Sequence, residues 1–377
     1  MRTIQRTLGI FIILFSVFVS PIQAKENSSS SWMESIAKDT KLSELSIPGT
    51  HDSATQYVSL SPIFQCQDAD IQTQLENGYR YLDIQLVLDD DQLILKHNFA
   101  KRRKNKFIFS KPLTLDDVLN DIYTFLDEHP SETIIFCVKK ENSKDDLNRV
   151  KSIFNSKINT DSWYTENRIP TLDEVRGKIV LATRFENDYG LYLNWQEQGD
   201  RAILDIPHKK ENMNVSESFF VQDRFNYGVE DKIDAIEYCL ENTKADDSTF
   251  HLNFTSTSGK GKIGFPKKNA KKINNHLMEY DWQKKYYGII IVDFANQELA
   301  HKIYSINEKV KAFYLALTFF CLNISKLNTA AALAESKAFL KSLPYSTTIF
   351  CLEAAVMVEL SPLKAPPRHK QKSDSKV

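Results

Sequence analysis

Residues 45–53 read LSIPGTHDS, and this stretch gives the first indication of both fold and site. A short apolar run meets Pro48-Gly49, a pair that favours a turn where a strand ends. We therefore predict a strand over residues 45–48 that is followed directly by His51 and Asp52. Taken alone, such a pair is typical of a surface loop whose carboxylate caps a helix. A chemical interpretation depends on what the later strands place beside it.

Short β-rich runs alternate with helical patterns from Ser31 to Lys311. This alternation predicts an α/β fold with parallel strands. The predicted strands lie at residues 45–48, 79–88, 92–96, 133–138, 178–182, 219–222, 251–254 and 288–292, and the predicted helices at 68–77, 116–128, 232–242 and 297–309. We interpret the polar stretch 187–218 as long loops.

Polar side chains capable of chemistry stand at or near the carboxyl end of strand after strand. In a parallel barrel these ends form the catalytic face. Two histidines near carboxylates suit paired general acid and base catalysis, and cations beside them suit a phosphate. The candidate residues are His51, Asp52, Asp83, Gln85, His97, Lys139, Arg184, Asp223 and Asp293.

Overall charge and composition exclude some classes of partner. The 48 Lys and Arg residues balance 49 Asp and Glu residues, so nothing in the net charge favours nucleic acid. The carboxylates at the strand ends are too few for a metal cage, and we expect neither a metal nor another cofactor. Five cysteines do not make a disulfide scaffold. Cys137 is predicted to be a buried thiol, and one or two bridges among the other cysteines remain open.

The two ends of the chain are predicted to lie outside the barrel. Residues 1–24 have the layout of a secretory signal peptide, with Arg2 and Arg6 before an apolar run. We thus expect a secreted, extracellular protein, or a periplasmic one in a Gram-negative source, whose catalytic domain spans residues 25–311. Residues 312–377 are expected to form a short helical extension and then a disordered basic tail, with a membrane anchor as the alternative.

Several motifs, in this order, resemble the bacterial phosphatidylinositol-specific phospholipases C, which contain the X domain. The resemblance covers about residues 31 to 310, and the blocks around IPGTHDS and PSETII are the most specific. The motifs are LSELSIPGTHDSATQ, QLENGYRYLDIQL, LKHN, PSETIIFCVKKE, RGKIVLATRF, FVQDRF, HLNFTS and GIIIVDF. The resemblance implies a distorted, incompletely closed TIM (β/α) barrel.

The same resemblance implies a catalytic mechanism that needs no metal. His51 would be the general base that takes the proton of the inositol 2-hydroxyl, and Asp293 would orient its imidazole. His97, partnered by Asp52, would protonate the departing diacylglycerol oxygen. The products would be diacylglycerol and inositol 1,2-cyclic phosphate.

Substrate recognition is implied in the same way, with one departure from the family pattern. Lys139, Arg184 and Asp223 match contacts to inositol hydroxyls, and Asp83 lies within the active-site strand. Gln85 stands where the bacterial pattern carries an arginine that contacts the phosphate. An amide brings no charge, and losing a charged donor to the transition state costs about 3 kcal/mol.

The basic run Lys101–Lys106 offers a replacement for the missing cation. The alternative is a solvated basic loop. Two further segments are expected to contact lipid or, equally, to pack on the rim: Ser258–Lys268, with Ile263 and Phe265, and the residues Tyr57, Val58, Leu60, Ile63 and Phe64.

The expected function is that of a secreted, monomeric phosphatidylinositol-specific phospholipase C. It would act at a membrane surface on phosphatidylinositol or on a glycosyl-phosphatidylinositol lipid. Two alternatives remain. One is a catalytically weak inositol-lipid-binding module of the same fold, and the other is a different phosphodiesterase barrel, such as a sphingomyelinase-like or glycerophosphodiesterase protein.

Overall fold

The computed structural model describes residues 28–308 apart from 98–99, 108–109, 142–143, 194, 196–207, 210–217, 244–247, 261–264 and 284–285. The predicted signal peptide and the predicted extension 312–377 therefore lie outside the described residues. So does most of the predicted loop stretch 187–218, within which β8 (Leu191–Tyr192) and β9 (His208–Lys209) are short strands.

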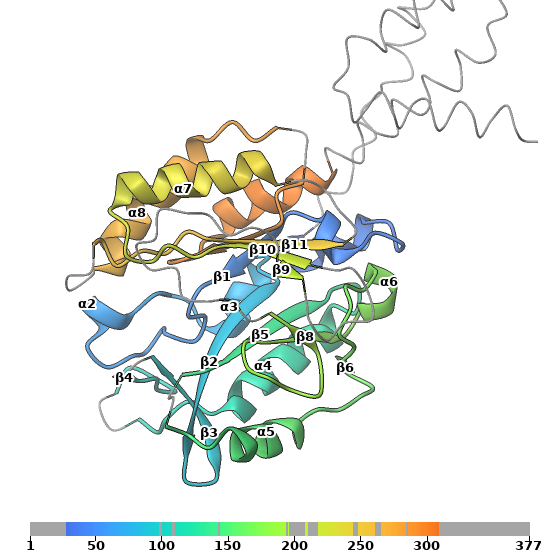
Figure 1. The fold of residues 1–377 in the computed structure, drawn as a ribbon, viewed down its shortest axis with the longest axis vertical. Coiled ribbons are helices and arrows are strands. Elements are labelled where there is room, and N and C mark those ends of the chain that lie inside the picture. The colour runs from blue at the N-terminus through green and yellow to red at the C-terminus, as the bar shows by residue number, and fades with distance from the viewer. Residues whose placement is uncertain are drawn as a thin grey trace, which may run out of the picture. The chain divides into compact units, whose positions relative to one another are not determined.

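A curled, mostly parallel sheet forms the centre of the fold (Figure 1). Its strand order is β6-β7-β5-β2-β1-β12-β11-β10-β9, with β8 paired to β7. In the described residues no ladder joins the β10–β9 edge to the β6–β8 edge, so the barrel is open. The ladder strands are β1 (Ile47–Thr50), β2 (Tyr81–Asp89), β5 (Ile134–Lys140), β6 (Trp163–Tyr164), β7 (Ile179–Thr183), β10 (Ser218–Gln222), β11 (Thr249–Phe254) and β12 (Ile289–Val292).

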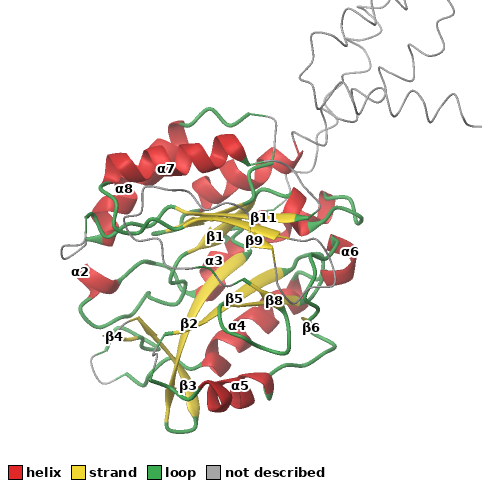
Figure 2. Ribbon diagram, in the orientation of Figure 1, coloured by secondary structure: helices red, strands yellow, loops and turns green. Residues whose placement is uncertain are grey.

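Helices cover the outer face of this sheet (Figure 2). The helices α4 (Leu115–Glu128) and α5 (Leu147–Asn155) pack on the β2–β5–β7 side, where every second strand residue joins one apolar cluster with them. The helices α7 (Val229–Asn242) and α8 (Pro266–Glu279) cover the β10–β11 side. Shorter elements are η1 (Ser29–Ser35), η2 (Leu42–Glu44), α2 (Ser61–Phe64), α3 (Ile71–Glu76) and α6 (Leu172–Val175), and residues 297–308 form the closing helix.

Residue alternation along the strands separates the two faces of the sheet. Leu82, Ile84 and Leu86 of β2 join the helix-facing cluster. Tyr81, Asp83 and Gln85 therefore face the barrel interior. The interior face of β2 therefore carries the polar residues Asp83 and Gln85, whereas its aliphatic residues pack against the helices.

The second histidine reaches the site differently from what the parallel pattern predicts. The strand β3 (Gln92–His97) runs antiparallel to β2, with Leu86 opposite Leu95, and then pairs with β4 (Ala100–Lys101). His97 is therefore at the end of a returning hairpin arm and not at the carboxyl end of a parallel strand. The turn at Asp89–Asp91, between the predicted strands 79–88 and 92–96, reverses the chain, and this reversal brings β3 back toward the edge that Asp83 and Gln85 occupy.

Other details correct the sequence predictions. The stretch 258–268 is not a loop throughout, because Pro266 begins α8 and places Lys267 and Lys268 in its first turn. Cys66 and Cys239 are free buried thiols, as is Cys137, so neither of the first two forms a bridge. No helix within the described ranges is long and apolar enough to cross a membrane.

Candidate active site

Strand register brings the predicted site residues to one edge of the interior face. Asp83 lies opposite Cys137 in the β2–β5 ladder, and Gln85 lies opposite Lys139. The β1–β12 ladder ends at Thr50 opposite Val292, so His51 and Asp293 follow on adjacent strands. The pairing of adjacent strands is thus enough to bring these predicted residues together at the carboxyl ends.

His51 and Asp293 form a close pair. The His51 Nδ1 lies 2.8 Å from Asp293 Oδ1, and the two side chains are 22% and 4% exposed. Burial lowers the pKa of His51, but the adjacent Asp293 carboxylate, with smaller contributions from Asp52 and Asp83, raises that pKa to about 10. Because Nδ1 is engaged by Asp293, Nε2 is the ring nitrogen left for another partner.

Gln67 holds the two strand ends together. Its Nε2 donates to the carbonyls of His51 and Val292 at 2.8 and 2.9 Å, and its Oε1 accepts from Ala295 at 3.0 Å. Asn274 of α8 adds a bond to the Asp293 carbonyl at 2.9 Å. Both amides are buried. Neither Gln67 nor Asn274 could be predicted from the sequence, because each connects segments that meet only in the folded chain.

Asp52 is bound to a partner that was not predicted individually. Its backbone has a positive φ of 46°, and its carboxylate pairs with Arg102 Nη2 at 2.5 Å, with both side chains fully buried. The Cys66 thiol lies 3.8 Å from the other carboxylate oxygen. The predicted pairing of Asp52 with His97 remains a prediction, since the His97 side chain lies outside the described residues.

Asp83 and Gln85 are buried on the interior face of β2. The Oδ2 atom of Asp83 accepts a bond from the Asp52 backbone N–H at 3.2 Å. Asp83 Oδ1 and Gln85 Oε1 are buried and have no hydrogen-bond partner among the described residues. Burial, together with the nearby Asp52 charge, raises the pKa of Asp83 although His51 opposes the shift. Unsatisfied buried acceptors of this kind suit a ligand that brings hydroxyl donors.

Arg184 and Asp223 meet through a tryptophan that the sequence did not single out. The Arg184 guanidinium lies 3.7 Å from the centre of the Trp195 ring, and Trp195 Nε1 donates to Asp223 Oδ2 at 3.0 Å. Lys139 Nζ lies 3.7 Å from Glu141 Oε2. These residues therefore form a polar wall with one flat aromatic surface.

Among the residues that the structure describes, two groups of side chains have metal-ligand composition. The ligand atoms of His51, Asp52 and Cys66 lie within 4.8 Å of one another, as do those of Glu76, Glu128 and His129. The first group contains the buried Arg102–Asp52 ion pair, and a guanidinium on the carboxylate opposes a second cation there. The second group belongs to the ends of α3 and α4 and not to the strand ends.

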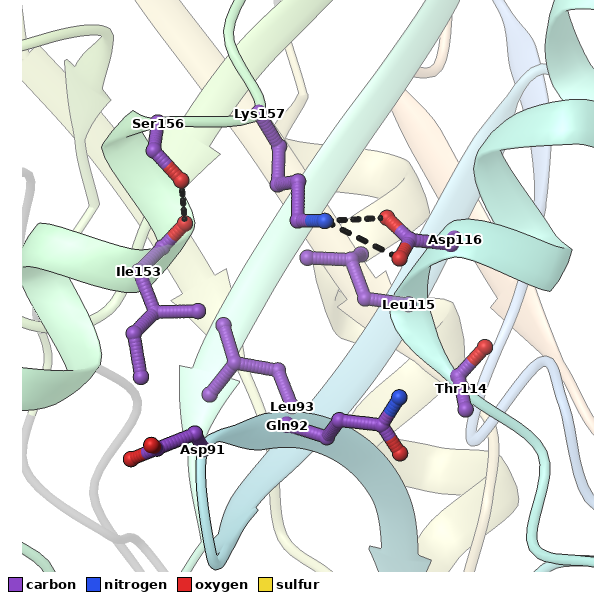
Figure 3. Close-up of a pocket in the computed structure, with 9 residues that line it drawn as sticks. All are labelled: Asp91, Gln92, Leu93, Thr114, Leu115, Asp116, Ile153, Ser156 and Lys157. Carbon is purple, nitrogen blue, oxygen red and sulfur yellow. Dashed lines mark hydrogen bonds and ion pairs between the residues drawn. The ribbon is translucent and has the colours of Figure 1, made fainter.

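A separate cavity of about 360 Å³ lies beside the start of α4 and the end of α5 (Figure 3). An ion pair between Lys157 and Asp116 crosses it. None of the predicted site residues lines this cavity. Its lining comprises Asp91, Gln92, Leu93, Thr114, Leu115, Asp116, Ile153, Ser156 and Lys157.

The fold and the site together define an open α/β barrel with a histidine–aspartate pair and cations at the carboxyl ends of its strands. A family model described as phosphatidylinositol-specific phospholipase C, X domain, matches residues 41–185. The chain therefore resembles the bacterial phosphatidylinositol-specific phospholipases C, as its motifs predicted, and the predicted open barrel is confirmed.

Named relatives and a solved structure resemble most of this chain. A 1-phosphatidylinositol phosphodiesterase of Listeria monocytogenes is 28% identical over 81% of this chain and 98% of its own length. One from Staphylococcus aureus is 27% identical over 76% of this chain and 92% of its own length. A crystal structure of the Staphylococcus aureus phosphatidylinositol-specific phospholipase C superposes with a TM-score of 0.61 at 24% identity, over 73% of this chain and 97% of that one. These relatives support the prediction of an enzyme of the phosphodiesterase or lyase class.

Proposed function

We propose that this protein is a phosphatidylinositol-specific phospholipase C that releases diacylglycerol and forms inositol 1,2-cyclic phosphate. The observation that carries the proposal is the His51–Asp293 pair at the carboxyl edge of the barrel. A hydroxyl can attack a neighbouring phosphorus only when a base removes its proton, and an imidazole with one nitrogen fixed by a carboxylate is suited to that role.

In this mechanism His51 acts as the base through Nε2. The Asp293 carboxylate fixes the tautomer and stabilises the imidazolium that forms. His97 is proposed to protonate the departing diacylglycerol oxygen. The returning arm of the β2–β3 hairpin supports this assignment, because Leu95, two residues before His97, lies opposite Leu86 next to Gln85.

The inositol ring is proposed to bind between β2 and the wall formed by Lys139, Arg184, Asp223 and Trp195. Arg184 and Asp223 offer a donor and an acceptor to vicinal hydroxyls, and Trp195 offers a flat apolar surface to the ring. The unsatisfied oxygen of Asp83 provides one more acceptor. This arrangement favours a polyhydroxylated headgroup over choline or ethanolamine.

The lipid is proposed to reach the site from a membrane surface. Leu60 and Phe265 are 57% and 54% exposed, and they directly precede α2 and α8, which pack against each other. Lys267 stands in the first turn of α8 beside them. Exposed apolar side chains next to lysine suit an anionic bilayer. Secretion, suggested by the predicted signal peptide, belongs to the same proposal.

Incubation of wild-type protein with phosphatidylinositol vesicles, with release of water-soluble inositol phosphates as the readout, tests this function. His51→Gln and Asp293→Asn are expected to lose at least about a hundredfold in rate, because each removes part of the base. Glu128→Gln, a matched acid-to-amide change at the end of α4, is expected to keep the rate. Equal rates for wild type and His51→Gln would contradict the proposal.

One structural observation favours a second candidate, a lipid-binding module with weak turnover. Gln85 is buried and neutral at the position where the bacterial pattern has a cation. Vesicle binding by wild type without release of inositol phosphates would favour this alternative over an enzyme.

A further inference from the structure

The buried side chain of Arg102 has hydrogen-bonding capacity that the described residues do not use. One nitrogen, Nη2, pairs with Asp52, while Nε and Nη1 are buried without a hydrogen-bond partner among the described residues. A buried guanidinium normally has its donors satisfied, because each unsatisfied donor has lost its water. Two unsatisfied donors on one side chain point to a ligand with acceptor oxygens.

The position of Arg102 is fixed by elements that surround the proposed site. Arg102 directly follows β4, and its backbone N–H donates to Leu95 of β3 at 3.3 Å. Its own carbonyl accepts from Leu113 at 3.0 Å, and an isolated bridge joins it to Val58. The residue is therefore rigidly held between the hairpin that carries His97 and the segment that follows His51.

A single residue, Asp52, connects Arg102 to the proposed base and to the strand of Gln85. Asp52 directly follows His51, and the Asp52 charge contributes to the raised pKa of His51. The Asp52 backbone N–H also donates to Asp83, two residues before Gln85 on the same face of β2. The guanidinium thus lies next to the place where the reacting phosphate would sit between base and leaving group.

The buried carboxylates of the proposed site make a cation such as Arg102 necessary for binding a phosphate. Asp52, Asp83 and Asp293 are three buried carboxylates, which together repel an anionic phosphodiester. Arg184, which stacks on the Trp195 ring, is already assigned to the inositol hydroxyls, and Lys139 lies beside Glu141. A planar guanidinium can hold a carboxylate on one nitrogen and phosphoryl oxygens on the others.

We propose that Arg102 binds the phosphoryl group of the substrate and supplies the positive charge that Gln85 lacks. Nη2 stays on Asp52, while Nε and Nη1 donate to phosphoryl oxygens as negative charge develops on them. This rests on the proposed function. The basic run 101–106 therefore divides in two, because Arg102 belongs to the proposed site, whereas Lys104, 41% exposed, pairs with Asp117 at the surface.

The test measures kcat and KM on phosphatidylinositol for Arg102→Lys, Arg102→Gln, Gln85→Arg and the double variant Gln85→Arg/Arg102→Gln, with thermal unfolding of each. Arg102→Lys keeps the charge but loses the fork, so kcat is expected to fall by about tenfold, and Arg102→Gln by about a hundredfold, with smaller effects on KM. Gln85→Arg is expected to give little gain in wild type but to restore much of the rate lost in Arg102→Gln. Arg103→Gln, at a residue whose side chain donates a hydrogen bond to Ser59, is the matched control and is expected to keep the wild-type rate.

Two results would overturn the proposal about Arg102. One is an unchanged kcat in a folded Arg102→Lys variant, and the other is an equal gain from Gln85→Arg with and without Arg102. Should Arg102→Gln fail to fold, the kcat values of Arg102→Lys and Gln85→Arg test the proposal instead. An inactive wild type would instead refute the proposed function, and the role of Arg102 with it.

Discussion

At the residue scale, the His51–Asp293 pair is expected to make activity rise with pH. Asp293 raises the pKa of His51 to about 10, so the imidazole is largely protonated near neutral pH and must lose that proton before it can act as a base. We therefore expect kcat/KM to rise with pH into the alkaline range. In Asp293→Asn the Asp293 carboxylate no longer raises the pKa of His51, while burial still lowers it. The rise of kcat/KM with pH should therefore move to lower pH, and the maximal rate should fall.

The same pair affects stability. Because the folded pKa of His51 lies above its ordinary value of 6.5, the pair contributes its full stability below that value and loses it as pH rises through about 10. Urea unfolding of wild type and Asp293→Asn should thus differ most near and below neutral pH and converge at high pH. A constant difference across the range would contradict this assignment.

Trp195 is expected to determine affinity for the headgroup. Trp195→Leu removes the stacking surface of Arg184 and the donor to Asp223, so KM should rise by about tenfold with a smaller change in kcat. Trp282→Leu, which loses a bond to the Leu277 carbonyl at the end of α8, is the matched control. An equal KM for the two variants would argue against an inositol site on this wall.

At the element scale, β1 and β2 approach so closely that only glycine fits at their crossing. A Cβ atom on Gly49 would lie 2.9 Å from the Tyr81 Cβ, which is close to the backbone of β2 and cannot move away. Gly49→Ala should therefore lower the free energy of unfolding by about 1 to 3 kcal/mol. Gly228→Ala, whose only tight contact would be with the flexible end of Lys260, is the control and should lose much less. Chemical denaturation measures both.

The segments before α2 and α8 should bind membranes independently of chemistry. Leu60→Ser and Phe265→Ser are expected to weaken partitioning onto phosphatidylinositol vesicles and to leave hydrolysis of a short-chain, monomeric substrate near wild type. Tyr238→Ser changes an equally exposed aromatic residue on α7 and serves as the control. Weakened vesicle binding by the control alone would place the lipid surface elsewhere.

At the scale of the whole molecule, the parallel strands could be predicted and the connections that deviate from them could not. Apolar runs bounded by turn residues indicate a strand such as β5 (Ile134–Lys140), and the capping pair Thr114–Asp117 marks the start of α4. The helix α8 was missed because only a narrow stripe of Ala270, Ile273, Asn274 and Leu277, behind Pro266, is buried. The antiparallel direction of β3 likewise could not be predicted, because a short apolar run does not indicate the direction in which its strand pairs.

The candidate site divides in the same way. Residues at strand ends, such as Asp83 and Asp293, could be predicted because the ladder register alone places them. Arg102, Trp195 and Gln67 could not, since each acquires its role from a contact with a segment far away in the sequence. Long-range pairs of this kind have no local pattern from which they could be inferred.

The mechanism proposed for this barrel is cleavage of phosphatidylinositol by internal attack of a hydroxyl that His51 activates. Phosphorus NMR of the products formed by wild-type protein from phosphatidylinositol, with a chelator present, tests it most directly. We predict a five-membered inositol 1,2-cyclic phosphate signal as the first product, absent with His51→Gln. The absence of that signal in the wild-type reaction, or its appearance only when calcium is added, would contradict the account.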